Sequence, residues 1–398
     1  MIFIRSSKHN LSETNKDKLR LYQQLRQDYQ QMVYFYVNYL WNNNPLSCPN
    51  LLPSNICNLI TTRTARLRQC AAKQACSMIH AATKKRQKQL FKLKQLQQEN
   101  KDTKKLQSKI NKFPLIKPNC NNVNPELDSR FVNFKESNNH FDLFVNIKNI
   151  GNLPVNYTKV SNKWKKQGQI KQAIRLLPNS IILIYEIEKE TRTKGKDIGI
   201  DQGYLTTASL SNQETTTKNK DGYDLENICE VLSKRKKGSK GFKRTQEHRK
   251  NYVNWSINQL NFNNVKKLKL EKLVNLRLSK RVSRRMSHFA YTLIKQKFIR
   301  LSEEKGFLFV EQDNKFRSQR CSKCGWTHKV NRKGKTFKCS KCGYCTDADL
   351  NAASNHEPEL VELPEKVWLQ HLNRTTGFYW FEEGVVGYEC IVRDVSKY

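Results

Sequence analysis

The order of apolar and polar residues divides the chain into a helical first part and a strand-rich middle part. From about residue 15 to residue 112, apolar residues recur at helical spacing, which predicts one helix followed by one or two long basic helices. Pro114 and Pro118 then break the pattern. From about residue 130 to residue 189, short β-rich runs alternate with turns, so we expect a small barrel or antiparallel sheet there.

Beyond residue 196 the periodicity changes again, and strands alternate with helices. The predicted elements are, in order, a strand–turn–strand over 197–211, a helix over 247–260, a strand over 265–273, a helix over 288–306, a strand over 307–312 and a short helix over 349–355. The basic run "SKRKKGSKGFKR" (233–244) is interpreted as a mobile loop. Mixed elements of this kind indicate an α+β chain with more than one domain.

The charge balance indicates that the protein binds a negatively charged partner. The 398 residues include 73 Lys and Arg against 35 Asp and Glu, a net charge of +38. Such a surplus favours a polyanionic partner, and nucleic acid is favoured over a membrane because no apolar run is long enough to span a bilayer. The first residues lack the layout of a signal peptide. We therefore expect an intracellular, cytoplasmic and nucleoid-associated protein.

The cysteines point to a metal. Of the twelve cysteines, five lie close together: Cys321, Cys324, Cys339, Cys342 and Cys345. The first four form two Cys-x2-Cys pairs separated by fourteen residues, each pair followed by glycine, a spacing that places four thiolates around one structural zinc ion. Cys345 could also chelate, but the symmetry of the two pairs makes it the weaker candidate.

Three acids fit a second metal site. Asp201 follows an apolar strand in "IGIDQG", Glu271 ends the strand "VKKLKLE", and Asp349 opens the helix "DLNAA". Two-metal nucleases need carboxylates that converge from such distant elements. Taken singly, the three acids could instead be a turn residue, a solvated strand end and a helix N-cap. The competing acids nearby are Asp197, Glu311, Asp313 and Asp347.

Together these motifs resemble the TnpB family of transposon-associated RNA-guided DNA nucleases, which are related to compact type V CRISPR effectors. "GIDQG", "KLEKL", the two cysteine pairs and "DADLNAASN" are similar to its RuvC-I, RuvC-II, zinc-ribbon and RuvC-III motifs, and the resemblance covers about residues 131–355. Gln202, Lys272, the "SNH" after NAA and the aromatic tail "LNRTTGFYWFEEG" depart from the family pattern.

The resemblance implies a multi-domain α+β fold: a wedge β-barrel with an inserted helical recognition lobe, and an RNase H-like RuvC nuclease domain with an inserted zinc ribbon. The implied bounds are 1–14 for a first wedge strand, 15–125 for the helical lobe, 126–195 for the barrel, 196–316 for the first part of RuvC, 317–345 for the ribbon and 346–398 for the last part of RuvC and the tail.

The resemblance also implies an activity: RNA-guided cleavage of double-stranded DNA next to a short recognised motif. The implied cofactors are a guide RNA, one structural Zn²⁺ at the cysteines and two Mg²⁺ ions, with Mn²⁺ as an alternative, at the three acids. The alternatives are a nuclease-inactive RNA-guided DNA-binding protein, a transposase-type protein without a guide, and a basic zinc-ribbon protein of RNA metabolism in which the acids are incidental. The candidate nucleic-acid contacts, for which a solvated surface is an equal alternative, are Lys234, Arg235, Lys236, Lys237, Arg281, Arg284 and Arg285. Trp326 could stack on bases or pack within the ribbon.

Overall fold

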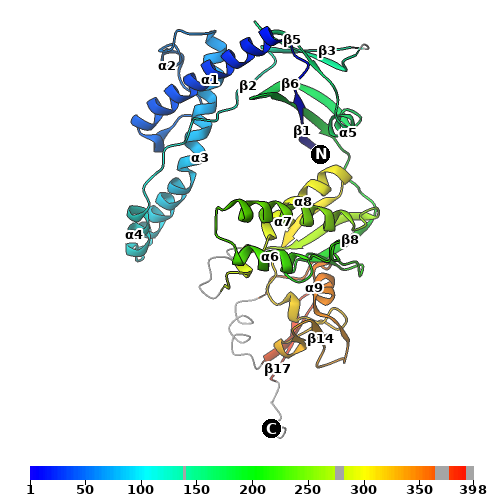
Figure 1. Ribbon diagram of the computed structural model, residues 1–398. Helices are drawn as coiled ribbons and strands as arrows, with labels where there is room; N and C mark the ends of the chain where they lie inside the picture. Colours follow the sequence, from blue (N-terminus) through cyan, green and yellow to red (C-terminus); the bar gives the residue numbers. More distant parts are fainter. Residues whose placement is uncertain (138–139, 274–281, 364–375, 391–398) are drawn as a thin grey trace. The chain divides into compact units, whose positions relative to one another are not determined.

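The chain folds as two units, and the boundary between them in the sequence follows Glu188. The computed structural model describes all residues except 138–139, 274–281, 364–375 and 391–398. The N-terminal unit comprises Ile2–Glu188, and the C-terminal unit comprises Lys189–Tyr398 together with Met1 (Figure 1). Among the described residues, no helix combines the length and the apolar character needed to cross a membrane.

Helices make up residues 16–112 of the N-terminal unit, as the periodicity predicts, with short connections between them. They are α1 (Lys16–Asn42), η1 (Pro45–Ser47), α2 (Ser54–Cys57), α3 (Ala65–Gln98) and α4 (Lys104–Lys112). On α1 the buried residues Tyr22, Leu25, Tyr29 and Met32 recur every three or four positions, so one face of the helix is apolar and belongs to the same core as α3. The basic stretch forms two helices, α3 and α4.

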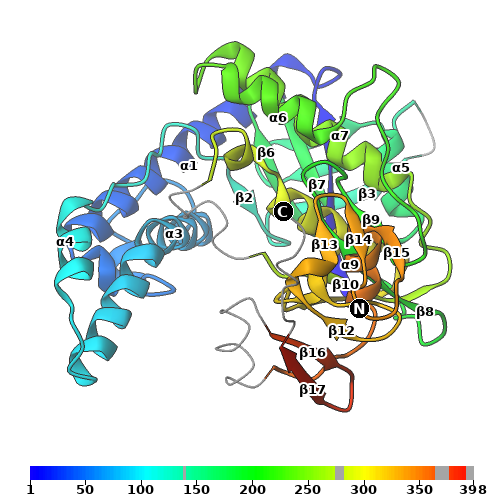
Figure 2. The ribbon, with the colours of Figure 1, turned by 90° about the horizontal axis from the view of Figure 1, so that it is seen from below.

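Antiparallel sheets form the rest of this unit (Figure 2). The strands are β1 (Ile2–Asn10), β2 (Glu126–Leu127), β3 (Val132–Glu136), β4 (Leu143–Ile147), β5 (Gly151–Val155), β6 (Gly168–Leu177) and β7 (Ser180–Glu188), and a short helix α5 (Lys159–Lys165) lies between β5 and β6. One sheet has the order β1-β7-β6-β2 and the other β3-β4-β5. The predicted antiparallel sheet is therefore confirmed, while its closure into a barrel stays a prediction.

A mixed sheet of order β11-β10-β8-β9 organises the C-terminal unit. Its strands are β8 (Lys196–Asp201), β9 (Ser209–Leu210), β10 (Val265–Glu271) and β11 (Leu308–Gln312), and β8, β10 and β11 run parallel. Parallel neighbours need crossover connections, which contain the helices α6 (Leu225–Lys234), α7 (Lys240–Asn258), η3 (Met286–His288) and α8 (Tyr291–Lys305). The predicted mobile loop over 233–244 is wrong in extent, because α7 begins at Lys240 with the Ser239 side chain as its cap.

Small sheets and one helix follow. The ribbon region contains η4 (Arg317–Gln319), η5 (Lys329–Asn331) and the strands β12 (Trp326–Thr327), β13 (Arg332–Lys333), β14 (Thr336–Lys338) and β15 (Cys345–Asp347), and α9 (Ala348–His356) comes next. The aromatic tail forms the hairpin β16 (Thr376–Trp380) and β17 (Val385–Cys390), and β16 pairs with β12. No local sequence pattern predicts that this tail completes a sheet of the ribbon.

Candidate functional site

Strand register brings the first two acids together. Strands β8 and β10 are parallel neighbours, and Ile200 lies opposite Leu270. The next residues, Asp201 and Glu271, are the last of their strands, so both carboxylates leave the sheet at its carboxyl edge. In open α/β sheets this edge is where ligands bind.

Helix α9 brings the third acid to the same edge. Asp347, the residue before the helix, accepts hydrogen bonds from the backbone N–H groups of Asp349 (2.8 Å) and Leu350 (3.2 Å), so Asp347 is the N-cap. The Asp349 side chain does not carry out that capping role. Gly199 in β8 permits the close approach of α9, because a Cβ at this position would lie 2.1 Å from the Ala353 carbonyl oxygen.

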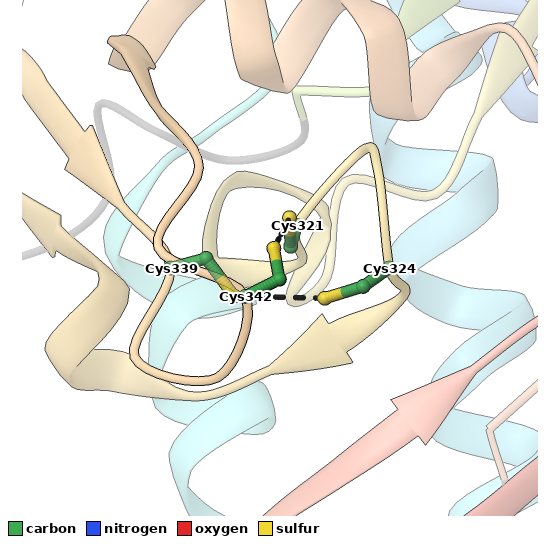
Figure 3. A group of neighbouring side chains, drawn as sticks. All are labelled: Cys321, Cys324, Cys339 and Cys342. Atoms are coloured by element: carbon green, nitrogen blue, oxygen red, sulfur yellow. Dashed lines mark hydrogen bonds between the residues drawn. The ribbon is translucent and has the colours of Figure 1, made fainter.

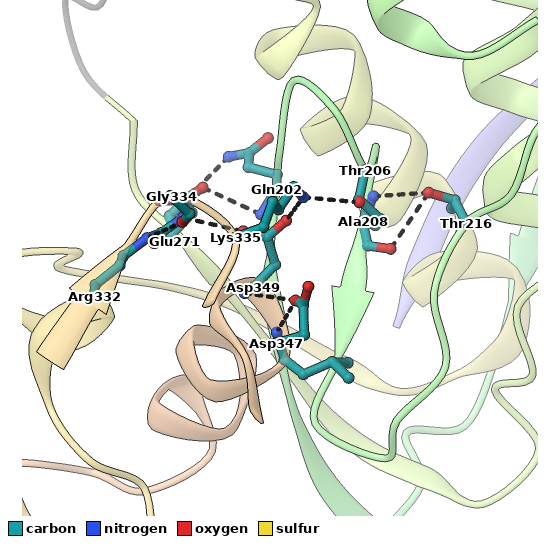
Figure 4. Close-up of polar contacts among 11 residues, drawn as sticks. Gln202, Thr206, Ala208, Thr216, Glu271, Arg332, Gly334, Lys335, Asp347 and Asp349 are labelled. Carbon is teal, nitrogen blue, oxygen red and sulfur yellow. Dashed lines mark hydrogen bonds and ion pairs between the residues drawn. The ribbon is translucent and has the colours of Figure 1, made fainter. Parts of the chain in front are cut away.

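The three acids line one pocket of about 540 Å³. Figure 4 shows Glu271 and Asp349 within a network of polar contacts that includes Gln202, Arg332 and Lys335. Glu271 is held from two sides, because the Gln202 backbone N–H donates to its Oε1 (3.2 Å) and the Gln202 side chain donates to its carbonyl oxygen (3.2 Å). The pocket is thus lined by carboxylates from three elements that lie far apart in the sequence.

Two of the carboxylates have raised pKa values. Burial, followed by the charges of Glu271 and Asp349, raises the pKa of Asp201 well above its ordinary value. Burial raises the pKa of Glu271 to about 7. In contrast, Asp349 is paired with cations from the ribbon: its Oδ1 lies 3.1 Å from Arg332 Nη2, and its Oδ2 contacts Lys335 Nζ. Burial thus favours the protonated forms of Asp201 and Glu271, whereas Asp349 has two cationic partners.

His356 belongs to the same pocket, and the sequence analysis did not identify it as a site residue. A ring nitrogen of His356 and carboxylate oxygens of Asp201 and Glu271 all lie within 4.8 Å of one another. Burial and the nearby Arg317 charge lower the pKa of His356 to about 3, so the imidazole is neutral near pH 7. The available signal was the histidine that follows NAASN, which departs from the family pattern.

The competing acids are engaged elsewhere. Glu311 Oε2 lies 2.5 Å from Lys295 Nζ. In the sheet Glu311 lies opposite Leu270, the residue before Glu271, so the two glutamates are not paired. Asp197 pairs with Lys269 (3.0 Å), and Asp313 pairs with Lys315 (3.5 Å). Together with the capping role of Asp347, these contacts leave Asp201, Glu271 and Asp349 as the acids that line the pocket.

Four cysteines form a separate cluster that could hold a metal ion. The Sγ atoms of Cys321, Cys324, Cys339 and Cys342 lie within 4.8 Å of one another and point toward a common centre (Figure 3). Cys321 Sγ is 3.7 Å from Cys342 Sγ, and Cys324 Sγ is 3.6 Å from Cys339 Sγ. Sulfurs bound to a tetrahedral zinc ion at about 2.3 Å lie about 3.8 Å apart, so the donor set fits zinc.

The two glycines explain the geometry of the cysteine pairs. Gly325 and Gly343 have φ values of +77° and +72°, a conformation that favours glycine, and their N–H groups donate to the carbonyl oxygens of Cys321 (2.9 Å) and Cys339 (3.1 Å). Each pair is therefore a tight turn that presents two thiols to one side. Cys345 is exposed, lies on β15 opposite Lys338, and is outside the four-sulfur cluster.

The predicted nucleic-acid contacts differ in how exposed they are and in which groups they already contact. Trp326 is fully buried, with its ring centroid 4.9 Å from that of Tyr379, so it packs inside the ribbon and is not available to stack on bases. The exposed candidates Lys234 and Arg285 pair with Glu230 (2.7 Å) and Glu226 (3.3 Å). Arg284 donates to the Arg235 carbonyl oxygen (3.0 Å), Lys236 and Lys237 are exposed, and Arg281 lies outside the described residues.

Comparisons with known proteins agree with the motifs. Residues 291–356, from α8 to the end of α9, match the family described as "Cas12f1-like, TNB domain". The CRISPR-associated endodeoxyribonuclease Cas12f1 of Sulfoacidibacillus thermotolerans is 29% identical over 205 residues, which cover 43% of this chain and 48% of that protein. The chain thus spans about half the length of this curated relative.

Two solved structures are also similar. A Cas12f1–sgRNA–target DNA complex matches 86% of this chain and 83% of its own chain, with 16% identity and a TM-score of 0.48. The mini-RNA-guided endonuclease CRISPR-Cas_phi3 matches 89% of this chain and 91% of its own, with 11% identity and a TM-score of 0.48. The family match and the Cas12f1 relative confirm the resemblance to compact TnpB- and type V effector-like proteins.

Proposed function

We propose that this chain is an RNA-guided DNA endonuclease that cleaves DNA by two-metal phosphodiester hydrolysis in a RuvC-type site. The observation that carries the proposal is the convergence of Asp201, Glu271 and Asp349, from β8, β10 and α9, on one pocket. The similarity to Cas12f1, whose name describes an endodeoxyribonuclease, supports the same reaction.

The donor set of the pocket fits Mg²⁺. Carboxylate oxygens are the hard ligands that Mg²⁺ prefers. Burial, the main cause of the raised pKa values of Asp201 and Glu271, disfavours their charged forms, and a bound divalent cation would stabilise those forms. Two bound Mg²⁺ ions would activate the attacking water and stabilise the leaving oxygen of the phosphodiester. Asp201, Glu271 and Asp349 would hold these ions.

Two cationic side chains of the ribbon, Arg332 and Lys335, contribute to the proposed site. Arg332 and Lys335 lie at the β13–β14 hairpin and reach the pocket beside Asp349. There they hold the Asp349 carboxylate, and they are positioned to neutralise an incoming phosphate. The proposed structural zinc at the four cysteines would fix this hairpin, so we infer that the ribbon supports the nuclease site.

The partners follow from charge. The net charge of +38 suits a guide RNA and double-stranded target DNA as partners. We propose that the N-terminal unit, as a wedge barrel over 126–195 with its first strand in 1–14 and a helical recognition lobe over 15–125, binds the guide. In the C-terminal unit, we propose a RuvC domain over 196–316 and 346–398 and a zinc ribbon over 317–345. The candidate contact for a DNA strand is the exposed group Lys234–Lys237, Arg284 and Arg285.

Cleavage of a plasmid library by the full chain, with the RNA that copurifies with it, tests this function. We expect Mg²⁺-dependent cutting of guide-matched plasmids, which Asp201→Asn reduces at least about a thousandfold while DNA binding persists. Asp313→Asn is the matched control, because Asp313 is an exposed acid outside the pocket. Binding without cutting by the wild-type protein would favour the inactive binder, and cutting that survives removal of the RNA would favour the guide-free alternative.

A further inference from the structure

We propose that His356 is a nitrogen ligand of the divalent ion held by Asp201 and Glu271. The inference rests on the metal site of the proposed function but not on guide RNA or DNA cleavage. It extends that site, because three carboxylates alone would form an all-oxygen set of protein ligands. With His356 the set is mixed, and that changes which metals it accepts.

Distance is the first argument. The candidate donor atoms of Asp201, Glu271 and His356 all lie within 4.8 Å of one another. Donors bound to one ion at about 2.1 Å lie about 3 Å apart when adjacent and about 4.2 Å apart when opposite. Small side-chain movements are therefore enough for the three groups to share one ion. Asp349 lies outside this group, and its carboxylate contacts Arg332 and Lys335.

The state of the imidazole is the second argument. His356 is 1% exposed, and its Nδ1 is buried with no hydrogen-bond partner among the described residues. A buried polar atom without a partner costs free energy, so an unpartnered nitrogen on a ring that lies beside two carboxylates suggests a ligand. His356 also lines the pocket that contains both acids. A cation bound between them would give the neutral ring a partner and balance the carboxylate charge.

The local fold explains how His356 reaches the metal position. It is the last residue of α9, seven positions after Asp349, so two helical turns place both residues on the same face. Gly199 allows the end of this helix to approach β8 closely, because a Cβ there would lie 2.8 Å from the carbonyl carbon of His356. One helix face thus supplies Asp349 near its beginning and His356 at its end.

The chemical consequence is metal preference. Mg²⁺ favours oxygen donors, whereas imidazole binds transition metals well. We therefore expect the Asp201–Glu271–His356 position to bind Mn²⁺ more tightly than Mg²⁺. Removing the imidazole should weaken Mn²⁺ binding about tenfold or more and change Mg²⁺ binding less.

Pulsed electron paramagnetic resonance of the full chain with Mn²⁺ alone tests the ligand directly. The wild-type protein should show ¹⁴N coupling from a directly bound imidazole, and His356→Gln should lose the coupling and bind Mn²⁺ about tenfold more weakly. His248→Gln is the control, because His248 lies on α7 outside the pocket. Circular dichroism and zinc content check that the His356 variant is folded.

The outcomes separate this inference from the proposed function. Mn²⁺ binding that Asp201→Asn abolishes but that shows no ¹⁴N coupling in the wild-type protein would overturn the role of His356 and leave the carboxylate site intact. Coupling that persists in His356→Gln would also overturn it. If Asp201→Asn leaves Mn²⁺ binding unchanged, both the inference and the proposed metal site are wrong.

Discussion

The C-terminal unit contains two candidate metal sites that are built in opposite ways. The four cysteines come from two tight turns between Cys321 and Cys342, and glycines with positive φ shape both turns. The acids come from β8, β10 and α9, between Asp201 and Asp349, and their proximity depends on sheet register and helix packing. The comparison shows that sequence spacing can specify one kind of site, whereas tertiary packing must assemble the other.

The two sites also differ in their effect on the free energy of folding. The thiols lie at distances that suit zinc, so metal binding there should stabilise the protein directly. Two of the pocket carboxylates, Asp201 and Glu271, have raised pKa values, which means that their ionised forms oppose folding when no cation is bound. Each prediction below changes one side of this contrast.

The largest effect should come from removing a zinc ligand. We expect Cys339→Ser to lose the zinc ion and to destabilise the ribbon by on the order of 5 kcal/mol, because structural zinc supplies folding free energy directly. Zinc content and thermal unfolding measure this. Cys345→Ser is the matched control, since Cys345 is exposed and outside the cluster. Loss of zinc in the control would show that the ligand set is different.

A smaller effect should follow from separating α9 from β8 without altering any ligand. We expect Gly199→Val to destabilise the C-terminal unit by about 3 kcal/mol, because the added side chain meets backbone atoms of α9 that cannot move independently. Mn²⁺ binding at the acids should fall while zinc content is retained. Normal Mn²⁺ affinity in this variant would mean that close packing of α9 is not what assembles the pocket.

The pH dependence of stability measures how much the ionised carboxylate of Glu271 destabilises the fold. The pKa of Glu271 is raised from 4.5 to about 7, so the folded protein holds a proton that the unfolded chain releases, and this contribution to stability falls as the pH rises from about 4.5 to 7. We expect Glu271→Gln to stabilise the protein by about 2 kcal/mol at pH 8 and by little at pH 4.5, without added divalent cation.

Thermal unfolding across this pH range measures the effect. Added Mg²⁺ should raise the melting temperature of the wild-type protein more than that of Glu271→Gln, because the variant has lost one metal ligand. An equal stabilisation at both pH values would show that the carboxylate charge is not the cause.

The smallest effect concerns the link between the two sites. Lys335 Nζ contacts Asp349 from the ribbon and would compete with a metal for that carboxylate. We expect Lys335→Gln to increase Mn²⁺ affinity about threefold, since a partly exposed ion pair contributes about 1 kcal/mol or less. Isothermal titration calorimetry measures this, with Lys333→Gln, an exposed neighbour, as control. Weaker binding would mean that Lys335 organises the metal site.

The local features of this protein can be predicted from its sequence. Periodicity predicted α1, α3 and the parallel strands, and the spacing of the cysteines predicted the four-sulfur cluster, because both depend on residues near each other in the chain. The identity of the three acids needed the order of elements and the family resemblance. Strand register and the capping of α9 then showed what Glu311 and Asp347 contact instead.

Tertiary structure alone decided what surrounds the acids. No local pattern connects Gly199 to α9, Lys335 to Asp349, or the tail strand β16 to β12, because each contact joins segments brought together by folding. His356 is the clearest case: in the sequence it is one residue beyond a motif, and in the fold its ring nitrogen lies beside two carboxylates. The sequence supplies the chemical groups, and tertiary packing decides which of them lie together in one pocket.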